Sequence, residues 1–262
     1  MLEKDLDRYL GRSRMSALRL KPEMLQIGAV SARPLPAGEA AVMPVRIHSK
    51  RGVFSKEEAA SLLVEARAIA AKYPDDPAVL SALAECEYDA GNDKEAIAAA
   101  DGAIARDRTQ ANAYVQKGYA LFRQAEDADG DDTARAAAWK AARAPFIALN
   151  RLENDHPLPL IYFYRSFVEQ GEKPTPLAID GLVRAMQLAP FDLGLRMTLG
   201  SALVRLGRTE DARVVLGPVA NNPHGGGLAD HARSMLERLD KEPGWTGEGM
   251  IAPDAEDTQA GA

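Results

Sequence analysis

Apolar residues recur at intervals of three and four from about Ser55 to about Leu239, which is the spacing of amphipathic helices. The first of these helices shows its start and its end in the sequence. Ser55 is a typical N-cap, Glu58 follows three residues later as in a capping box, and Pro74 stops the helix. Its apolar stripe consists of Leu62, Leu63, Ala66 and Ile69. From there the pattern predicts further helices up to about Leu239.

Residues 1–54 follow a different pattern. Apolar positions in residues 1–10 have helical spacing and predict a short amphipathic helix. Further on, short apolar bursts separated by prolines predict a β-hairpin with strands Gln26–Arg33 and Ala41–Ile47. Pro44 places the second strand at a sheet edge. We expect a small α+β segment that depends for its stability on the following helices or on a segment upstream.

The end of the chain changes once more. Apolar residues on one face predict a closing helix whose charged side points outward, with Leu228, Ala232, Met235, Leu236 and Leu239 on the apolar side. Residues 241–262 are rich in glycine, proline and acidic residues and offer little to bury, so we expect a disordered acidic tail. The predicted division is therefore residues 1–54, a helical region over 55–240, and the tail over 241–262.

Internal repetition is the strongest signal in the helical region. A unit numbered from Pro77 has small or apolar residues at positions 4, 7, 8, 15, 20, 24 and 27. The next unit begins 34 residues later at Ala111, and others begin at Pro159 and Leu193. The last unit repeats the pattern with Leu199, Gly200, Leu203, Gly207, Ala212 and Leu216.

This spacing resembles the tetratricopeptide repeat (TPR), a helix-turn-helix unit of 34 residues. Small residues at positions 8 and 20 let the two helices of a unit approach closely, and large residues at positions 4, 7, 11 and 24 fill the remaining space. Each unit buries its faces only by stacking on its neighbours. The resemblance implies an all-α, right-handed TPR solenoid, to which the N-terminal helix and β-hairpin are an appendage.

Two stretches depart from the regular repeat. From Ala111 to Pro159 there are 48 residues, 14 more than one period, and the excess lies around residues 125–137. We expect a longer loop or an extended second helix there. In the third unit Gly171 comes early and the EKPTP stretch lengthens the turn.

Composition supports helices and narrows the function. Hydrophobic residues make up 46% of the chain and aromatic residues only 6%, which favours helices packed at small side chains over a β-sandwich. A formal net charge of -6 argues against nucleic-acid binding. A single cysteine, Cys86, forms no internal disulfide, and no apolar run has the length of a membrane span. We expect a cytoplasmic location for the chain as given, or a periplasmic one if it is a fragment of an exported protein.

Catalysis finds no support in the residue pattern. The HGGG stretch from His224 resembles the oxyanion-hole motif of esterases, but the chain has no GxSxG nucleophile elbow. The aspartates at 127–132 suggest a calcium loop, yet its sixth and twelfth positions hold Asp132 and Ala138 in place of Gly and Glu. No histidine pair forms HExxH. We therefore expect no catalytic residue, no metal site and no cofactor.

The TPR resemblance implies a binding role instead. In TPR arrays the first helices line a concave face, and positions 2, 5, 9, 12 and 13 point into it. Those positions and their neighbours at position 6 give a candidate partner-binding groove of Glu85, Tyr88, Asn112, Gln116, Tyr119, Arg123, Tyr164, Phe167, Ser201 and Arg205, with Phe122, Phe163 and Val204 beside them. Phe163 and Phe167 fit a core role equally well, because the third unit is irregular. The implied partner is a protein or peptide segment.

Residues 1–54 carry a second, less specific resemblance. The stretches DRYLGRSRMSALRL and VSARPLPAGEAAVMPVRIHSKRGVF resemble the segment that precedes TPRs in bacterial peptidase-MA-like proteins, which are zinc-metallopeptidase-like. Their HExxH motif is absent here, so no catalytic residue carries over. Two hypotheses stay open: a non-catalytic interaction scaffold, which we favour, and the C-terminal substrate-docking or remnant part of such a peptidase. They differ on whether residues 1–54 fold alone and whether zinc or proteolysis is relevant.

Overall fold

The chain forms two units, residues 1–35 and residues 36–262. The computed structural model describes residues 4, 7–9, 11, 19–25, 28–32, 34–224 and 226–249. In the first unit, residues 4 and 7–9 are helical and Pro22–Met24 form a short 3-10 helix, η1. The remainder of the helix predicted over residues 1–10 lies outside the described residues.

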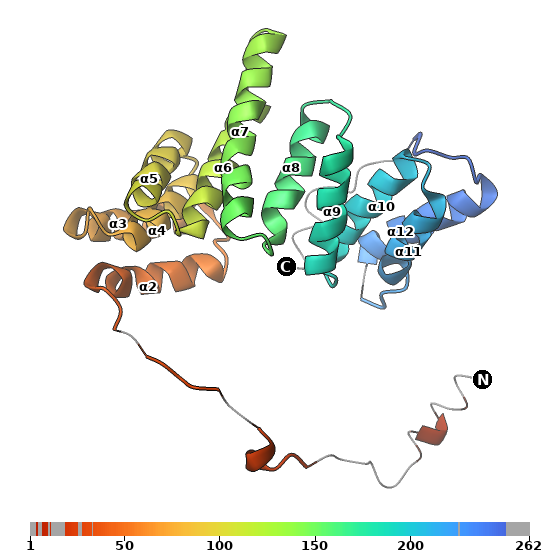
Figure 1. Cartoon of the computed structure of the whole chain (residues 1–262), viewed down its shortest axis with the longest axis horizontal. Helices are drawn as coiled ribbons and strands as arrows, with labels where there is room; N and C mark the ends of the chain where they lie inside the picture. The colour runs from red at the N-terminus through yellow and green to blue at the C-terminus, as the bar shows by residue number, and fades with distance from the viewer. Residues whose placement is uncertain are drawn as a thin grey trace. The chain divides into compact units, whose positions relative to one another are not determined.

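Helices joined by short turns make up the second unit (Figure 1). They are α2 (Ala37–Lys50), α3 (Lys56–Lys72), α4 (Pro77–Asp89), α5 (Asp93–Arg106), α6 (Ala111–Glu126), α7 (Asp132–Leu152), α8 (Pro157–Glu169), α9 (Pro176–Leu188), α10 (Leu193–Arg205), α11 (Thr209–Ala220) and α12 (Gly226–Lys241). No β-strand occurs in the part of the chain that the structure describes, so the fold is all-α.

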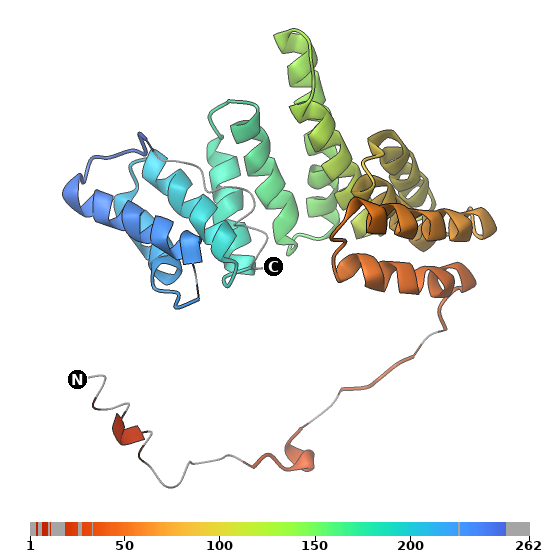
Figure 2. The same cartoon turned by 180° about the vertical axis from the view of Figure 1, so that it is seen from behind.

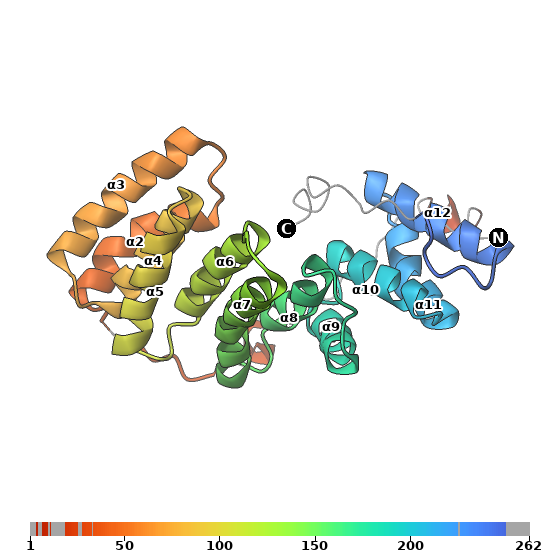
Figure 3. The same ribbon diagram turned by 90° about the horizontal axis from the view of Figure 1, so that it is seen from above.

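The helices pair in chain order, as the repeat predicts. Helix α4 packs on α5, α6 on α7, α8 on α9 and α10 on α11, and α12 packs on α11. Seen from above, α4, α6, α8 and α10 form one layer, here called the first-helix layer (Figure 3). Helices α5, α7, α9 and α11 form the other, the second-helix layer. This arrangement confirms the predicted helix-turn-helix solenoid.

The predicted β-hairpin is wrong for its second strand. Ala41–Ile47 belong to helix α2, which lies beside α3 (Figure 2) and also packs on α4. Val42 and Val45 are fully buried against these helices, and their spacing of three residues is helical rather than extended. Of the first predicted strand, residues 28–32 are not extended in a ladder, and residues 26, 27 and 33 lie outside the described residues.

Helix α8 corrects the register of the third unit by two residues. It begins at Pro157, whereas α4, α6 and α10 begin at the first position of their units. Counted from Pro157, the third unit matches the others in burial. Position 3 is buried in every unit, as Val79, Ala113, Pro159 and Leu195, and so is position 8, as Ala84, Gly118, Tyr164 and Gly200. A tyrosine thus occupies the close crossing where the other units have alanine or glycine.

Close helix crossings explain the small residues at position 8. A methyl group at Gly118 would lie 2.4 Å from Cζ of Phe146 in α7, and one at Gly200 would lie 2.4 Å from Cδ2 of Leu216 in α11. Glycine at position 15 has a different role. Gly91 has φ of 85°, a left-handed conformation that ends α4 and turns the chain into α5.

The additional residues of the second unit lengthen helix α7, which has 21 residues. Asp131 begins this helix, since its carboxylate accepts a hydrogen bond of 2.8 Å from the backbone N–H of Ala134. The predicted extended second helix is therefore present. Asp131 is one of the aspartates at 127–132 that suggested a calcium loop. Its role in the structure is that of the N-cap of α7.

Residues 242–249 differ from the disordered tail expected there. Trp245 is 6% exposed and packs into the core cluster of α8–α12. Its indole N–H donates to the backbone oxygen of Glu248 at 2.9 Å, and the guanidinium of Arg238 lies 4.5 Å from its ring centroid. The Trp245 ring buries apolar area that the surrounding residues lack, which favours an ordered segment here.

Candidate functional site

A pocket of about 420 Å³ opens on the first-helix layer where α2, α4, α6 and the start of α8 meet. Five of the residues predicted for the partner-binding groove line it, namely Glu85, Tyr88, Asn112, Gln116 and Tyr119. Ser49, Lys50, Asp89 and His156 complete its polar lining. We refer to this cavity as the first-layer pocket. Because it joins four helices that are far apart in the sequence, its shape depends on how the units stack.

Glu85 is the buried charge of the first-layer pocket, at 7% exposed. Its Oε1 accepts hydrogen bonds from Ser49 Oγ at 2.7 Å and Lys50 Nζ at 2.8 Å. Its Oε2 accepts one from Asn112 Nδ2 at 2.9 Å. A buried carboxylate is tolerated only when it is paired and hydrogen-bonded in this way. Helix α2 therefore supplies the cation that a partner would otherwise have to bring to Glu85.

Gln116 carries the one fully buried side-chain polar atom among the pocket's lining residues that the described residues leave without a hydrogen bond. Its side chain is 4% exposed, and its Nε2 donates to Asn112 Oδ1 at 3.3 Å. The other end of the amide, Oε1, has no hydrogen-bond donor among the described residues. A buried acceptor without a donor costs on the order of 1–3 kcal/mol. A bound group with an N–H or O–H would recover that free energy.

Aromatic rings form one wall of the first-layer pocket. The Tyr119 ring lies 5.5 Å from the Tyr88 ring and 4.9 Å from the Tyr162 ring, measured between centroids. Tyr162 in turn stacks on Phe146 at 4.7 Å. Burial raises the pKa of the Tyr119 and Tyr88 hydroxyls, so both stay protonated at neutral pH. The wall is rigid and apolar, with neutral hydroxyls at its edge.

Arg123 was predicted to face a partner, but its Nε and Nη2 donors are already used within the fold. Its Nε donates to both carboxylate oxygens of Asp93 at 3.0 Å, and its Nη2 donates to Asp93 and to the backbone oxygen of Tyr88. The guanidinium also lies 4.2 Å from the Tyr88 ring centroid. Arg123 therefore ties α6 to α4 and α5 and supports the aromatic wall.

The remaining predicted groove residues lie elsewhere. Tyr164 and Arg205 line a separate cavity of about 460 Å³ between α8, the α8–α9 turn and α10. Phe167 is half-buried, with its ring 4.4 Å from the Arg143 guanidinium and edge-on to Phe163 at 5.3 Å. Ser201 is half-buried on α10. The predicted set is thus divided between two cavities, with Phe167 and Ser201 in neither, partly because the register of the third unit was two residues off.

Three residues beside the predicted groove are packing residues to different degrees. Phe122 and Val204 are buried, at 3% and 0% exposed. Phe163 is half-buried and packs against the core cluster of α8–α12. The alternative that Phe163 is a core residue therefore agrees with its packing against this cluster.

Four lining residues were missed in the sequence. Ser49 and Lys50 end helix α2, which the pattern had placed in a strand, so nothing pointed to their meeting Glu85. His156 is the N-cap of α8, and its Nδ1 accepts from the Leu158 N–H at 3.3 Å. Burial and the nearby Glu85 carboxylate raise the pKa of Asp89 from 3.8 to about 6. The sequence signal that could have pointed to Asp89 is its spacing of four residues from Glu85, which places both carboxylates on one face of α4.

The described residues offer little basis for a metal site or a reactive cysteine. Within them, no group of three or more His, Cys, Asp or Glu side chains is placed to hold a metal ion. Cys86 is 2% exposed, and burial raises the pKa of its thiol to about 12, so the nucleophilic thiolate does not form at neutral pH. His224 lies in the turn between α11 and α12, where its N–H bonds Asn222. In the described part of the chain, no helix is long and apolar enough to cross a membrane.

Comparison with known proteins supports the fold. No family model and no curated protein matches the chain. Among solved structures, it is similar to a thermophilic TPR protein of Thermus thermophilus, at 17% identity and a TM-score of 0.59 over 77% of this chain and 100% of that one. It also matches the assembly chaperone of RpL4, residues 1–338, at 12% identity and a TM-score of 0.34 over 79% and 99%.

The likeness to the Thermus protein, together with the stacked helix pairs, defines this chain as a TPR-type helical solenoid. The resemblance of residues 1–54 to peptidase-MA-like proteins receives no support from these comparisons and stays a prediction.

Proposed function

We propose that this protein is a non-catalytic interaction scaffold that binds a segment of a partner protein in the first-layer pocket. The observation that carries the proposal is Gln116, a residue that lines the cavity and whose buried Oε1 has no donor among the described residues. An extended peptide offers backbone N–H groups at regular intervals, and one of them would satisfy this atom. The aromatic wall of Tyr88 and Tyr119 would pack against a peptide side chain next to that N–H group.

The charges of the pocket suggest which side chain a partner brings. Two carboxylates, Glu85 and Asp89, stand against a single ammonium group, that of Lys50. The Lys50 side chain is 63% exposed and held on one side only. A lysine or arginine of the partner segment would be attracted by Asp89 and would compete with Lys50 for Glu85. We therefore propose a segment with a basic residue.

A substitution at Gln116 tests this proposal without disturbing the fold. Gln116→Leu keeps the side-chain volume close and removes the unsatisfied acceptor, but it also removes the 3.3 Å hydrogen bond from Nε2 to Asn112 Oδ1, so stability should change little. Peptides selected from a random display library on the immobilised full chain should bind the wild type and bind Gln116→Leu at least about tenfold more weakly. Gln187→Leu, an exposed position on α9, is the matched control and should bind as the wild type does.

Two results contradict the proposal. One is a selected peptide that binds Gln116→Leu as tightly as it binds the wild type, since the buried acceptor would then have no part in recognition. The other is the failure of any peptide to be enriched over an unrelated helical protein. Circular dichroism of both variants shows whether the helices are intact.

A further inference from the structure

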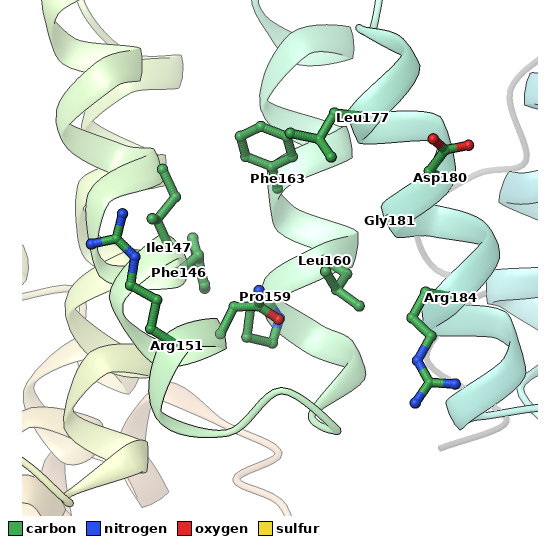
Figure 4. Close-up of a pocket in the computed structure, with 11 residues that line it drawn as sticks. Phe146, Ile147, Arg151, Pro159, Leu160, Phe163, Leu177, Asp180, Gly181 and Arg184 are labelled. Atoms are coloured by element: carbon green, nitrogen blue, oxygen red, sulfur yellow. The ribbon is translucent and has the colours of Figure 1, made fainter.

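A second cavity of about 420 Å³ lies between α7 and α9, with α8 as its floor (Figure 4). It belongs to the second-helix layer and shares no lining residue with the first-layer pocket. We refer to it as the second-layer pocket. Its floor carries Leu160 and Phe163, and its walls carry Ile147 from α7 and Leu177 from α9. The pocket is therefore a predominantly apolar groove bounded by three helices.

Large apolar side chains are exposed in this groove. Leu177 is 70% exposed and Ile147 is 39% exposed, while Phe163 is half-buried between them and the core. Isolated exposed leucines are common on protein surfaces, but a contiguous apolar groove of this kind is typical of a binding site. Burying Leu177 and Ile147 would add to the stability of a complex.

Two arginines flank the apolar groove from opposite walls. Arg151 extends from α7 and Arg184 from α9, on either side of α8 (Figure 4). Both are exposed, and neither has a hydrogen bond or ion pair to any residue that the structure describes. Asp180, one turn before Arg184 and also without a described partner, is the only acidic residue in the lining. The second-layer pocket thus combines an apolar centre with an excess of positive charge at its sides.

We propose that the second-layer pocket binds an amphipathic helix of a partner protein whose apolar face is flanked by glutamate or aspartate. The helical floor and walls suit a helix, since ridges of side chains on one helix pack into the groove between others. Carboxylates on both flanks would pair with Arg151 and Arg184 in a charge-assisted, bidentate manner. This surface is distinct from the one proposed above, so the scaffold has two binding faces.

A pair of designed peptides tests the charge requirement. The first is about 15 residues long, near the length at which an isolated helix becomes marginally stable, with leucines on one face and glutamates on both flanks. The second has lysine in place of every glutamate. Titration of the full chain into each labelled peptide, followed by fluorescence anisotropy, should show that the glutamate peptide binds at least about tenfold more tightly.

Variants of the full chain locate the binding. Arg151→Glu combined with Arg184→Glu should reverse the preference between the two peptides, and Leu177→Asp should weaken the glutamate peptide about tenfold. The matched controls are Arg135→Glu, about 24 Å from Arg151 along α7, and Val214→Asp, 75% exposed on α11. Both controls should bind the glutamate peptide as the wild type does, and so should Gln116→Leu.

Three outcomes overturn the inference. The two peptides bind equally, the charge-reversed double variant keeps the wild-type preference, or neither peptide binds saturably. Because Arg151, Arg184 and Leu177 are exposed, their substitution should leave the circular dichroism spectrum unchanged. If this inference fails, the proposal for the first-layer pocket is unaffected, since that proposal depends on Gln116 and a different peptide.

Discussion

Replacing Gly118 with alanine should destabilise the fold, although alanine is the better helix former. Gly118 lies in the middle of α6 and faces the Phe146 ring of α7. An added methyl carbon would lie 2.4, 2.7 and 2.8 Å from three carbons of that ring. Non-bonded carbon atoms prefer a separation of about 3.5–4.0 Å. The ring or the helix would have to move by roughly 1 Å to restore that separation.

The surroundings of Phe146 leave little room for such a movement. The ring is 1% exposed and stacks on Tyr162 at a centroid distance of 4.7 Å. Overpacking of a core typically costs about 1–3 kcal/mol, whereas alanine in place of glycine in a helix gains about 1 kcal/mol. We expect Gly118→Ala to lower the free energy of unfolding by up to about 2 kcal/mol.

Gly181→Ala is the matched control for this prediction. Gly181 lies within α9, and an added methyl carbon there would lie 3.6 Å from Leu160 Cδ2, which is an ordinary contact. The change in the unfolded chain is the same for both substitutions, so the difference between them reports the contact with Phe146. We expect Gly181→Ala to raise the free energy of unfolding by up to about 1 kcal/mol.

Urea unfolding followed by the fluorescence of Trp139 measures the effect where it arises, because Trp139 belongs to the same core cluster as Phe146. Trp245, the second tryptophan, is replaced by phenylalanine in all variants to isolate this signal. In a double-mutant cycle, Phe146→Leu should cost less in the Gly118→Ala background than in the wild type. If Gly118→Ala proves as stable as Gly181→Ala, the argument from the close crossing is wrong.

Three further predictions concern individual side chains. Arg123→Ala should lower the free energy of unfolding, measured in urea, by about 1–2 kcal/mol, because Asp93 and the Tyr88 carbonyl lose their donor at a partly exposed site. Arg123→Lys should restore only part of the loss. The pKa of Asp89 is raised from 3.8 to about 6, so its carboxylate binds a proton more tightly in the folded state than in the unfolded state. In urea titrations the wild type should therefore lose stability relative to Asp89→Asn as the pH rises from about 4 to about 6. Cys86 should resist a thiol reagent at pH 8 in the folded protein and react fully in urea, and rapid labelling of the native chain would contradict its burial.

Repetition made much of the solenoid predictable. Positions 8 and 15 of each unit are set by local geometry, the first by the close crossing within a helix pair and the second by the turn between the helices. Gly118, Gly200 and Gly91 could therefore be assigned their roles from spacing alone. The same reasoning failed for α8, where prolines at 157 and 159 offer two helix starts and the residue at the crossing is Tyr164 rather than a small one.

Helix α2 shows where local pattern was insufficient. Prolines at 34, 36 and 44 and short apolar bursts are typical of strands and turns, and these features predicted a hairpin. The helix forms because Val42 and Val45 are buried against α3 and α4, so tertiary packing outweighs a proline within the helix. Residues 49 and 50 thereby reach Glu85, which no pattern in the sequence indicated.

The helix pairs, their order, and the small residues at their crossings follow from the repeat pattern of the chain, since each of these depends on contacts within one repeat. Which candidate side chains are available to a partner depends instead on contacts between repeats. Glu85 is paired with Lys50, 35 residues away, and Arg123 with Asp93, 30 residues away, whereas Gln116 is left with an unsatisfied oxygen. These partnerships join neighbouring repeats, and they depend on how closely the stacked helices bring side chains together, which spacing along the chain does not specify.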